Sequence, residues 1–368
     1  MNPNRYAHLT DLMQSAGLDA LVLNPGPTMT YLTSLIFHLN ERPTVLLISP
    51  QAAPALILAE LEILKAKLSS IPVHPFTYND NPDSWQAAFN KAVQALHLDG
   101  KRIGVEPERL RVLEINFLES AAPGAKFVSA ANLLASLRMQ KDEQEIAAMR
   151  KAVQIAQQGL QATLPFIKAG VSEHQVAAEL TLQLLRAGSD PEMPFPPIVS
   201  SGPNSANPHA SPGERILTPG DLLVIDWGAA YHGYFSDLTR TFAVGQVIPE
   251  FEEIAKIVAG ANAAGRSAAR PGIPAGRVDQ AARAVITQAN YGPFFHHRVG
   301  HGLGMEGHEP PYMYGENQLI LAEGMTFTVE PGIYLADRGG VRIEDDVVIT
   351  RDGTETLSDL PRQLIHIG

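Results

Sequence analysis

The sequence predicts two domains, an α/β domain at residues 1–136 and an α+β domain at residues 137–368 that carries an internal repeat. Short apolar runs alternate with helical spacing over the first part of the chain. The charged, helix-prone stretch Leu137–Glu145 (LRMQKDEQE) marks the boundary. Two helix-opening segments, Lys168–Val171 and Arg270–Ile273, recur at an offset of 102 residues. These three observations define the expected fold class.

In the first domain, apolar residues at helical spacing predict helices at Tyr6–Ala16 and Trp85–Leu96. Short apolar runs at Ala20–Leu23, Thr44–Ile48 and Ile103–Glu106 predict buried strands. This alternation favours a small mixed sheet. No pattern of catalytic residues occurs in this part, so we expect it to have a structural or oligomerising role.

The repeat in the second domain has the same context in both copies. Each helix-opening segment follows a long predicted helix, Glu145–Leu164 or Glu250–Ala269, and each precedes strands rich in acidic residues. A capping-box pair, Ser172 and Gln175, opens the first of the two shorter helices. Two similar halves predict a pseudo-two-fold domain with a site between them.

Composition excludes several functional classes. Hydrophobic residues make up 45% and charged residues 18%, which is typical of a globular protein. The net charge of -11 repels phosphate backbones, so no nucleic-acid partner is expected. Without cysteine, disulfides and thiolate metal sites are impossible, and any metal must bind His, Asp or Glu. Residues 1–14 lack the apolar core of a signal peptide, and no stretch approaches the ~20 apolar residues of a membrane span. We therefore expect a cytoplasmic protein.

Two aspartates occur in a predicted apolar hairpin. Its strands are Leu222–Ala230, which contains Asp226, and Tyr234–Val244, which contains Asp237. If the turn centres between residues 231 and 232, the aspartates lie directly opposite. If it centres one residue later, they are diagonal neighbours. Either register places both carboxylates on one face of the hairpin.

Two glutamates repeat this arrangement in a second predicted hairpin. Glu330 belongs to the strand Thr326–Tyr334, and Glu344 belongs to Gly340–Thr350. The two residues are opposite if the intervening loop centres on Asp337. Solvated pairs on surface hairpins are the alternative, but two such pairs among apolar neighbours are improbable by chance, because facing buried charges are costly without compensation.

A histidine cluster lies between the two hairpins. The segment His296–His308 (HHRVGHGLGMEGH) holds four histidines and four glycines, and glycines permit close backbone approach. Four carboxylates and one neutral imidazole carry a charge of about -4, which two divalent ions would balance. Oxygen ligands with one nitrogen suit Mn²⁺, Co²⁺, Fe²⁺ or Zn²⁺. Two such ions roughly 3.5–4 Å apart can activate a water and stabilise a tetrahedral intermediate.

These residues resemble those of the M24 peptidases with the pita-bread fold, the family of aminopeptidase P, prolidase, methionine aminopeptidase and creatinase. The resemblance covers the whole chain and is strongest from Pro194 to Thr241 and from His297 to Thr350. It implies two divalent metal ions per chain, with manganese expected first and cobalt, zinc or iron as alternatives. It also implies how the ligands are shared. Asp226 would bind one ion, Asp237 and Glu344 would bridge both, and His301 and Glu330 would complete the second. Glu330 would also be the general base.

The resemblance extends to residues around the ligands. The segment Ile198–His209 is similar to the family segment that delivers a substrate-facing histidine. His209 and His308 would hydrogen-bond the scissile carbonyl and the peptide backbone. His297 would support the prolyl side of the substrate. Arg342, two residues before Glu344, would orient a carboxylate.

The implied function is hydrolysis of Xaa-Pro bonds at peptide N-termini or in dipeptides, through a hydroxide that bridges the metals. The implied partners are short proline-containing peptides and a second copy in a homodimer. The first domain is similar to that of aminopeptidase P, prolidase and creatinase. A creatinase-like hydrolase and a binding module without catalysis are the alternatives, and the intact ligand set argues against both.

One departure from the family pattern bears on the substrate. Several prolidases carry a basic residue, which holds the dipeptide carboxylate, where this chain has Glu309–Tyr312 (EPPY). Arg338, Arg298 or a residue of a partner subunit are the alternatives for that role.

Overall fold

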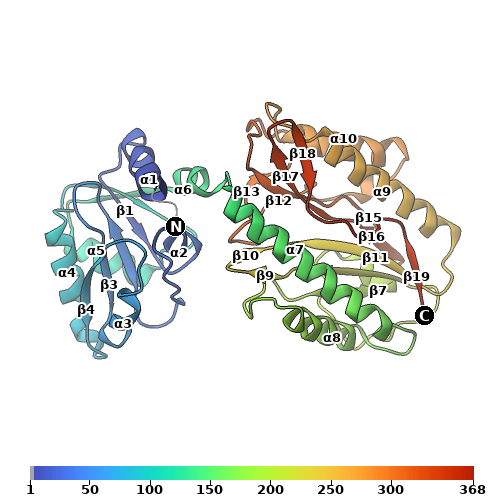
Figure 1. The fold of residues 1–368 in the computed structure, drawn as a ribbon, viewed down its shortest axis with the longest axis horizontal. Coiled ribbons are helices and arrows are strands. Elements are labelled where there is room, and N and C mark those ends of the chain that lie inside the picture. Colours follow the sequence, from blue (N-terminus) through green and yellow to red (C-terminus); the bar gives the residue numbers. More distant parts are fainter. Residues whose placement is uncertain (1–3) are drawn as a thin grey trace. The chain divides into compact units, whose positions relative to one another are not determined.

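The computed structural model describes residues 4–368 and separates into two compact units, Met1–Arg138 and Met139–Gly368 (Figure 1). The first unit has an α/β composition, and the second combines long helices with several antiparallel sheets. Among the described residues, no helix combines the length and apolar character that crossing a membrane requires.

The N-terminal unit is built on a six-stranded mixed sheet of order β4-β3-β2-β1-β5-β6. The central strand β1 is antiparallel to β2 and parallel to β5, as expected for a mixed sheet. Helices α4 and α5 pack their apolar side chains, Phe89 and Leu118 among them, on the buried strands. The strands are β1 (Ala20–Leu23), β2 (Val45–Ile48), β3 (Ala55–Ala59), β4 (His74–Tyr78), β5 (Arg102–Val105) and β6 (Lys126–Ser129). The helices are α1 (Asn4–Ser15), α2 (Pro27–Thr33), η1 (Glu60–Glu62), α3 (Ile63–Ala66), η2 (Pro82–Ser84), α4 (Trp85–Ala95), α5 (Val112–Ala121) and α6 (Ala131–Arg138).

The C-terminal unit contains two pairs of helices, each a long helix followed by a shorter one. The first pair is α7 (Glu143–Thr163) and α8 (Glu173–Arg186), and the second is α9 (Pro249–Ala268) and α10 (Gly276–Gln288). The predicted capping box at the start of α8 is present, and a second one opens α7. Short 3₁₀ helices lie at η3 (Leu164–Phe166), η4 (Gly202–Ala206) and η5 (Gly292–Phe294).

Two larger sheets of the C-terminal unit carry Asp226 and His301 within their strands, and Asp237, Glu330 and Glu344 lie next to the ends of their strands. One has four strands in the order β19-β11-β8-β7, and the other has five in the order β13-β12-β14-β17-β18. Two-stranded sheets join β9 to β10 and β15 to β16. The strands of the first half, and β19, are β7 (Ile198–Ser201), β8 (Leu222–Trp227), β9 (Ala230–Tyr231), β10 (Tyr234–Phe235), β11 (Leu238–Val244) and β19 (Ile365–Ile367). The remaining strands are β12 (His301–Gly302), β13 (Glu309–Tyr312), β14 (Thr326–Val329), β15 (Gly332–Leu335), β16 (Gly339–Arg342), β17 (Asp345–Thr350) and β18 (Gly353–Thr356).

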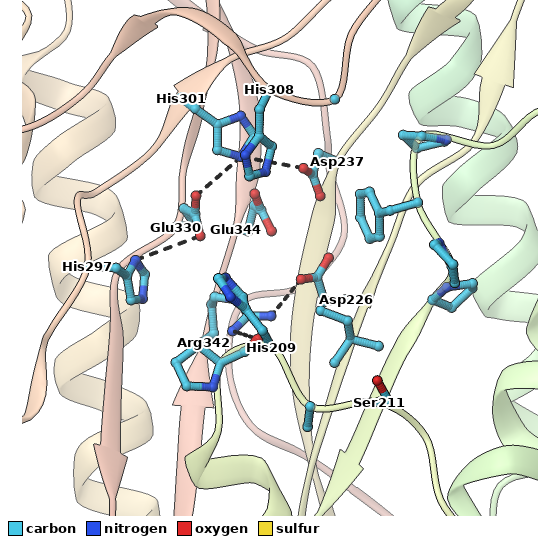
Figure 2. Close-up of a pocket in the computed structure, with 18 of the residues that line it drawn as sticks. His209, Ser211, Asp226, Asp237, His297, His301, His308, Glu330, Arg342 and Glu344 are labelled. Atoms are coloured by element: carbon cyan, nitrogen blue, oxygen red, sulfur yellow. Dashed lines mark hydrogen bonds and ion pairs between the residues drawn. The ribbon is translucent and has the colours of Figure 1, made fainter. Parts of the chain in front are cut away.

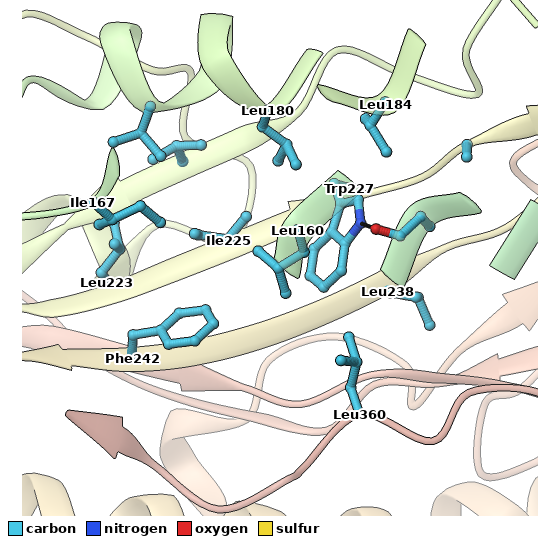
Figure 3. Packing of buried hydrophobic residues seen from close by; sticks show 14 of the residues in the cluster. Leu160, Ile167, Leu180, Leu184, Leu223, Ile225, Trp227, Leu238, Phe242 and Leu360 are labelled. Atoms are coloured by element: carbon cyan, nitrogen blue, oxygen red, sulfur yellow. Dashed lines mark hydrogen bonds between the residues drawn. The ribbon is translucent and has the colours of Figure 1, made fainter. Parts of the chain in front are cut away.

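In strand β8, the alternation of side chains between the two faces separates apolar residues from Asp226. Leu223, Ile225 and Trp227 belong to a buried cluster that also contains residues of α7 and α8 (Figure 3). The indole Nε1 of Trp227 donates a hydrogen bond to the carbonyl of Ala156 in α7 at 2.9 Å. Because successive side chains point to opposite faces, Asp226 projects from the other side of the strand.

The registers of the two acidic hairpins decide between the predicted alternatives. Thr239 pairs with Asp226, so Asp237, two residues earlier, is its diagonal neighbour. In the second hairpin, Val329 pairs with Asp345 and Gly332 with Arg342, and this register centres on residue 337 and sets Glu330 opposite Glu344. Neither hairpin is continuous. The first is interrupted at residues 228–229 and 236–237, and Asp237 lies in the second of these breaks rather than within a strand. The second hairpin is interrupted as well. Both strands are interrupted at the glutamates, where β14 gives way to β15 and β16 to β17.

The halves of the C-terminal unit repeat one another as the sequence predicts. Helices α7 and α8 precede the antiparallel pair β8–β11, and α9 and α10 precede the antiparallel pair β14–β17. The halves meet where Thr239 of β11 forms a bridge with Glu344. The predicted class, an α/β domain followed by an α+β pita-bread domain with an internal repeat, describes the structure.

Candidate metal centre

Five residues from five separate segments converge in the C-terminal unit (Figure 2). Ligand atoms of Asp226, Asp237 and Glu344 lie within 4.8 Å of one another, and so do those of His301, Glu330 and Glu344. Glu344 belongs to both groups, so the two sets of donors adjoin. All five residues are those predicted from the sequence as ligands.

The imidazole of His301 points toward carboxylates from both hairpins. Its Nε2 lies 3.4 Å from Glu330 Oε1 and 3.7 Å from Asp237 Oδ2. Its Nδ1 lies 3.1 Å from the carbonyl oxygen of Gly302. Because a carbonyl only accepts, Nδ1 carries the proton, and the lone pair of Nε2 faces the carboxylates. Burial lowers the pKa of His301 to about 3, so the ring is neutral and able to bind a cation.

Glycines allow the His301 segment to approach its neighbours. A Cβ on Gly300 would lie 2.0 Å from the carbonyl oxygen of Thr328, and a Cβ on Gly302 would lie 2.4 Å from that of Pro310. Neither distance is sterically possible, so any side chain at these positions would displace β12 and the imidazole with it. Gly300 and Gly302 of the predicted cluster are therefore required by close backbone packing.

The charge balance of the site calls for cations. Asp237, Glu344 and Asp226 are buried, and Oδ1 of Asp226 has no hydrogen-bond partner among the described residues. Burial, together with the neighbouring carboxylates, raises the pKa of Asp237 and of Glu344 well above the ordinary range. Burial also raises the pKa of Glu330 to about 7. Divalent ions would supply the missing positive charge and a partner for the orphaned oxygen, so the residues fit a metal site.

Arg342 is the one guanidinium that contacts a ligand carboxylate of this group within the described chain. Its Nη2 donates to Asp226 Oδ2 at 2.6 Å, and its Nε donates to Thr239 Oγ1 at 3.1 Å. Thr239 Oγ1 in turn donates to Glu344 Oε2 at 2.6 Å. Arg342 Nη1 donates to the hydroxyl of Tyr334 at 3.0 Å. The side chain therefore contacts two carboxylates of the donor group, one directly and one through a threonine.

Three further histidines line the same cavity, which has a volume of about 820 Å³. His308 stacks beside His301, with ring centroids 3.7 Å apart, and its nitrogen also groups with Asp237 and His301 as a possible ligand. Nε2 of His297 lies 3.0 Å from the hydroxyl of Tyr334. Burial, and then the charge of Arg342, lowers the pKa of His297 to about 3. His209 is exposed on the cavity wall.

Comparison with known proteins accounts for this arrangement. The sequence profile of metallopeptidase family M24 matches residues 147–351, and the creatinase/prolidase N-terminal domain profile matches residues 5–140. The chain belongs to metallopeptidase family M24. The chain is therefore a metallopeptidase, and the carboxylate and histidine donors described above fit the divalent metal that an M24 enzyme uses.

Relatives of this M24 chain match it over nearly their full lengths. A Xaa-Pro dipeptidase from Lactobacillus delbrueckii subsp. lactis is 33% identical, with 97% of each chain covered. The crystal structure of a dipeptidase from Pyrococcus horikoshii OT3 is 35% identical, with a TM-score of 0.93 and coverage of 99% and 100%. The crystal structure of an X-Pro aminopeptidase from Thermotoga maritima MSB8 is 31% identical, with a TM-score of 0.86 and coverage of 98% and 99%.

The structure adds site residues of this M24 chain that sequence reasoning missed. Tyr334 is buried and joins Arg342 to His297, and Thr239 joins Arg342 to Glu344. Strand alternation could have indicated Tyr334, because residues 330, 332 and 334 project to one face. No sequence signal marked the proline-rich wall of the cavity, which consists of Pro194, Pro196, Pro197, Pro208 and Pro212.

Two arginines named as alternatives for the substrate carboxylate have different surroundings. Arg338 is paired with Glu250 on the surface and does not line the cavity. Arg298 lines the cavity, with its guanidinium carbon 4.3 Å from the centroid of the Tyr312 ring. No ion pair joins Arg298 to a carboxylate within residues 4–368. Glu309, in the segment that departs from the prolidase pattern, is buried against Lys141 at 2.5 Å.

Proposed function

We propose that this chain hydrolyses the bond before proline in Xaa-Pro dipeptides, with two divalent ions held by Asp226, Asp237, His301, Glu330 and Glu344. The observation that carries the proposal is the convergence of these five donors in two adjoining groups that share Glu344, with the buried Asp226 Oδ1 left without a hydrogen-bond partner among the described residues. When bound, the two ions would lower the pKa of a water and polarise the scissile carbonyl. Manganese is the metal we expect first, since hard carboxylate donors dominate the set.

Glu330 would act as the general base. Its carboxylate lies at the edge of the donor group, 3.9 Å from His297 Nδ1, and Thr328 Oγ1 lies 3.4 Å from it. In the metal-free protein its pKa of about 7 already lies in the range where a carboxylate can both accept and return a proton. Glu330 would take a proton from the attacking water and deliver it to the departing proline nitrogen.

His209 and His308 would stabilise the charge that develops on the carbonyl oxygen. Both line the cavity from different segments, and His308 lies beside the ligand His301. A donor aimed at a developing oxyanion in a site that excludes water stabilises the transition state more than the ground state. His297, fixed through Tyr334, and the proline-rich wall would contact the prolyl ring of the substrate.

Arg298 favours a dipeptide as the substrate. A dipeptide places its terminal carboxylate one residue beyond the scissile bond, and the half-buried Arg298 is the guanidinium that lines the cavity besides Arg342. Arg342 is already engaged with Asp226. Arg298 would therefore hold the carboxylate, a charge-assisted contact that a longer peptide would not make in the same place. The relative named Xaa-Pro dipeptidase supports this assignment, and the neighbour named X-Pro aminopeptidase supports the longer-peptide alternative.

We further propose that the chain acts as a homodimer. The resemblance of its N-terminal domain to that of the proline-specific peptidases supports this. Light scattering of the purified protein over a range of concentrations tests it, and a mass of one chain at all concentrations would exclude it.

The decisive experiment compares two substrates on Mn²⁺-loaded enzyme, a Xaa-Pro dipeptide and the corresponding Xaa-Pro-Yaa tripeptide. Hydrolysis of the dipeptide with little or none of the tripeptide is the expected result. A preference for the tripeptide would identify an aminopeptidase instead. An Ala-Ala dipeptide serves as the control for proline, and chelator-treated enzyme serves as the control for metal.

A further inference from the structure

A buried carboxylate outside the metal centre holds the segment that carries His209. Glu173 is the first residue of α8, has an exposed fraction of 0%, and does not line the cavity. The segment, residues 201–213, is called the His209 loop below. It begins at the end of β7, passes through the 3₁₀ helix η4, and returns toward the start of α8.

The two oxygens of Glu173 close this loop at both ends. Oε1 accepts hydrogen bonds from the backbone N–H of Ser201 at 2.7 Å and from its hydroxyl at 2.8 Å. Oε2 accepts from the backbone N–H of Gly213 at 3.1 Å. The side-chain amide of Asn204 lies 3.2 Å from each oxygen. One carboxylate thus fixes the first and last residues of the loop and a third residue near its start.

The contacts of Glu173 are not explained by its place on the helix. The start of α8 is already capped by the side chains of Ser172 and Gln175, each of which bonds the backbone N–H of the other. The carboxylate of Glu173 bonds no amide of its own helix among the described residues, since all its partners belong to the His209 loop. Burying a carboxylate costs free energy that these hydrogen bonds offset, and the bonds order the loop.

His209 depends on the backbone of this loop for its position. The imidazole makes no hydrogen bond to another residue within the described part of the chain, and the side chain is exposed. Near the tip, Arg342 Nη1 donates to the carbonyl of Pro208 at 3.1 Å. Loss of the closure at the base of the loop would let the tip move, and a shift of about 1 Å at a catalytic group can lower a rate by about 100-fold.

We propose that Glu173 is a positioning residue for His209, acting through closure of the His209 loop. The proposal rests on the proposed function of His209 in stabilising the carbonyl oxygen. Glu173 itself touches neither the substrate nor the metal ligands. Its removal should therefore reduce turnover only to the extent that His209 contributes to turnover.

A double-mutant cycle on Mn²⁺-loaded enzyme tests this dependence. The variants are Glu173→Gln, His209→Ala and the pair, with kcat and KM measured on the Xaa-Pro dipeptide. Glutamine keeps the volume but replaces one acceptor with a donor, so one end of the loop loses its partner. We expect Glu173→Gln to lower kcat by about 10- to 100-fold with little change in KM, and to add no more than about twofold to the loss in the His209→Ala background. Equal losses in both backgrounds would overturn the proposal.

A second measurement reports on His209 without reference to any substrate. In Zn²⁺-loaded protein with isotope-labelled histidine, the His209 ring signal is identified by its absence in His209→Ala. We expect this signal to shift or broaden in Glu173→Gln, while the signal of His97 in the N-terminal unit stays unchanged. An unchanged His209 signal would overturn the proposal.

If the wild type fails to cleave Xaa-Pro peptides, the proposed function fails, and the ring signal still decides the role of Glu173. Asn204→Ala, which removes the amide contacts to the two oxygens of Glu173, replaces Glu173→Gln in both experiments if the latter does not fold.

Discussion

Arg342 and Asp226 form a buried ion pair in which one carboxylate oxygen is bonded and the other is not. Arg342 Nη2 lies 2.6 Å from Asp226 Oδ2, while Asp226 Oδ1 has no hydrogen-bond partner in the described structure. The guanidinium therefore fixes the plane of the carboxylate and leaves one oxygen for a cation. We propose that Arg342 orients Asp226 as a metal ligand rather than neutralising the site.

Replacement of Arg342 should weaken metal binding. Arg342→Lys keeps the charge but cannot reach Asp226, Thr239 and Tyr334 together, because it lacks the planar fork. We expect Arg342→Lys to lower metal affinity or activity by about 10- to 100-fold. Titration of the metal-free protein with Mn²⁺ measures the affinity directly. Arg338→Ala is the matched control, because that arginine pairs with Glu250 on the surface and should leave affinity unchanged. Equal metal affinity in Arg342→Lys and the wild type would contradict the orienting role.

Glu330→Gln should separate peptide binding from turnover. The amide keeps the shape of the side chain and removes the proton acceptor, so kcat should fall by about 10²- to 10⁴-fold. Binding of the dipeptide, measured by calorimetry on metal-loaded protein, should change much less. Metal content must be measured alongside, because Glu330 also belongs to the donor group. Xaa-Pro hydrolysis at the wild-type rate would remove Glu330 from the role of general base.

Arg298→Ala should act on substrate binding rather than on chemistry. Loss of a charge-assisted contact to the terminal carboxylate removes about 1.5–3 kcal/mol, which corresponds to a rise in KM for the dipeptide of about 10- to 100-fold. The kcat should change little. Steady-state kinetics on the dipeptide and on its C-terminal amide measure the effect, and the amide should be equally poor for variant and wild type. If the variant and the wild type discriminate equally between acid and amide, the carboxylate binds elsewhere.

The raised carboxyl pKa values should make the stability of the metal-free protein fall as the pH rises above about 6.5, where the lowered pKa values of His297 and His301 no longer act in the opposite direction. The folded-state pKa values of Asp237 and Glu344 lie well above the ordinary range, and that of Glu330 is about 7. The folded state therefore binds more protons than the unfolded state, in which carboxyls titrate near pH 4. The stabilising effect of these protons is complete below about pH 4. The contribution of Glu330 is lost as the pH rises through about 7, and those of Asp237 and Glu344 are lost as the pH rises through their own raised pKa values.

Bound metal should remove this pH dependence of stability, and it should therefore stabilise the protein most at high pH. Cations replace the protons, so the increase in Tm that Mn²⁺ produces should be larger at pH 8 than at pH 5.5. Thermal unfolding of metal-free and metal-loaded protein across that range measures it. A metal-induced increase in Tm that does not vary with pH would mean that the carboxylates are ionised before the metal binds.

The acidic hairpins could be predicted because the paired residues are close together in the sequence. Periodicity placed Asp226 and Asp237 on one face, and the position of Asp337 set Glu330 opposite Glu344. The interruption of the second hairpin at the glutamates could not be predicted from period-2 alternation. At this interruption Glu344 forms a bridge with Thr239, which belongs to a strand from the other half of the unit.

Contacts between residues that are far apart in the sequence could not be predicted from local sequence patterns. Tyr334 became a site residue through its hydroxyl, which meets His297 and Arg342. In the sequence, Glu173 is an acidic residue at the start of a predicted helix. Acidic residues are common there because they interact favourably with the positive end of the helix dipole. Its link to the His209 loop depends on tertiary packing across 28 to 40 positions of the chain.

The bridge between Thr239 and Glu344 has a consequence for how the catalytic unit opens. The backbone N–H of Glu344 donates to the carbonyl of Thr239 at 3.1 Å, so one amide spans the junction of the two halves. Its hydrogen can exchange with solvent only when the halves separate there. The proposed metal ligands come from both halves, so bound ions should oppose that separation. Exchange at this amide should therefore slow when the ions bind, which would make it a reporter of cooperative opening in the whole unit.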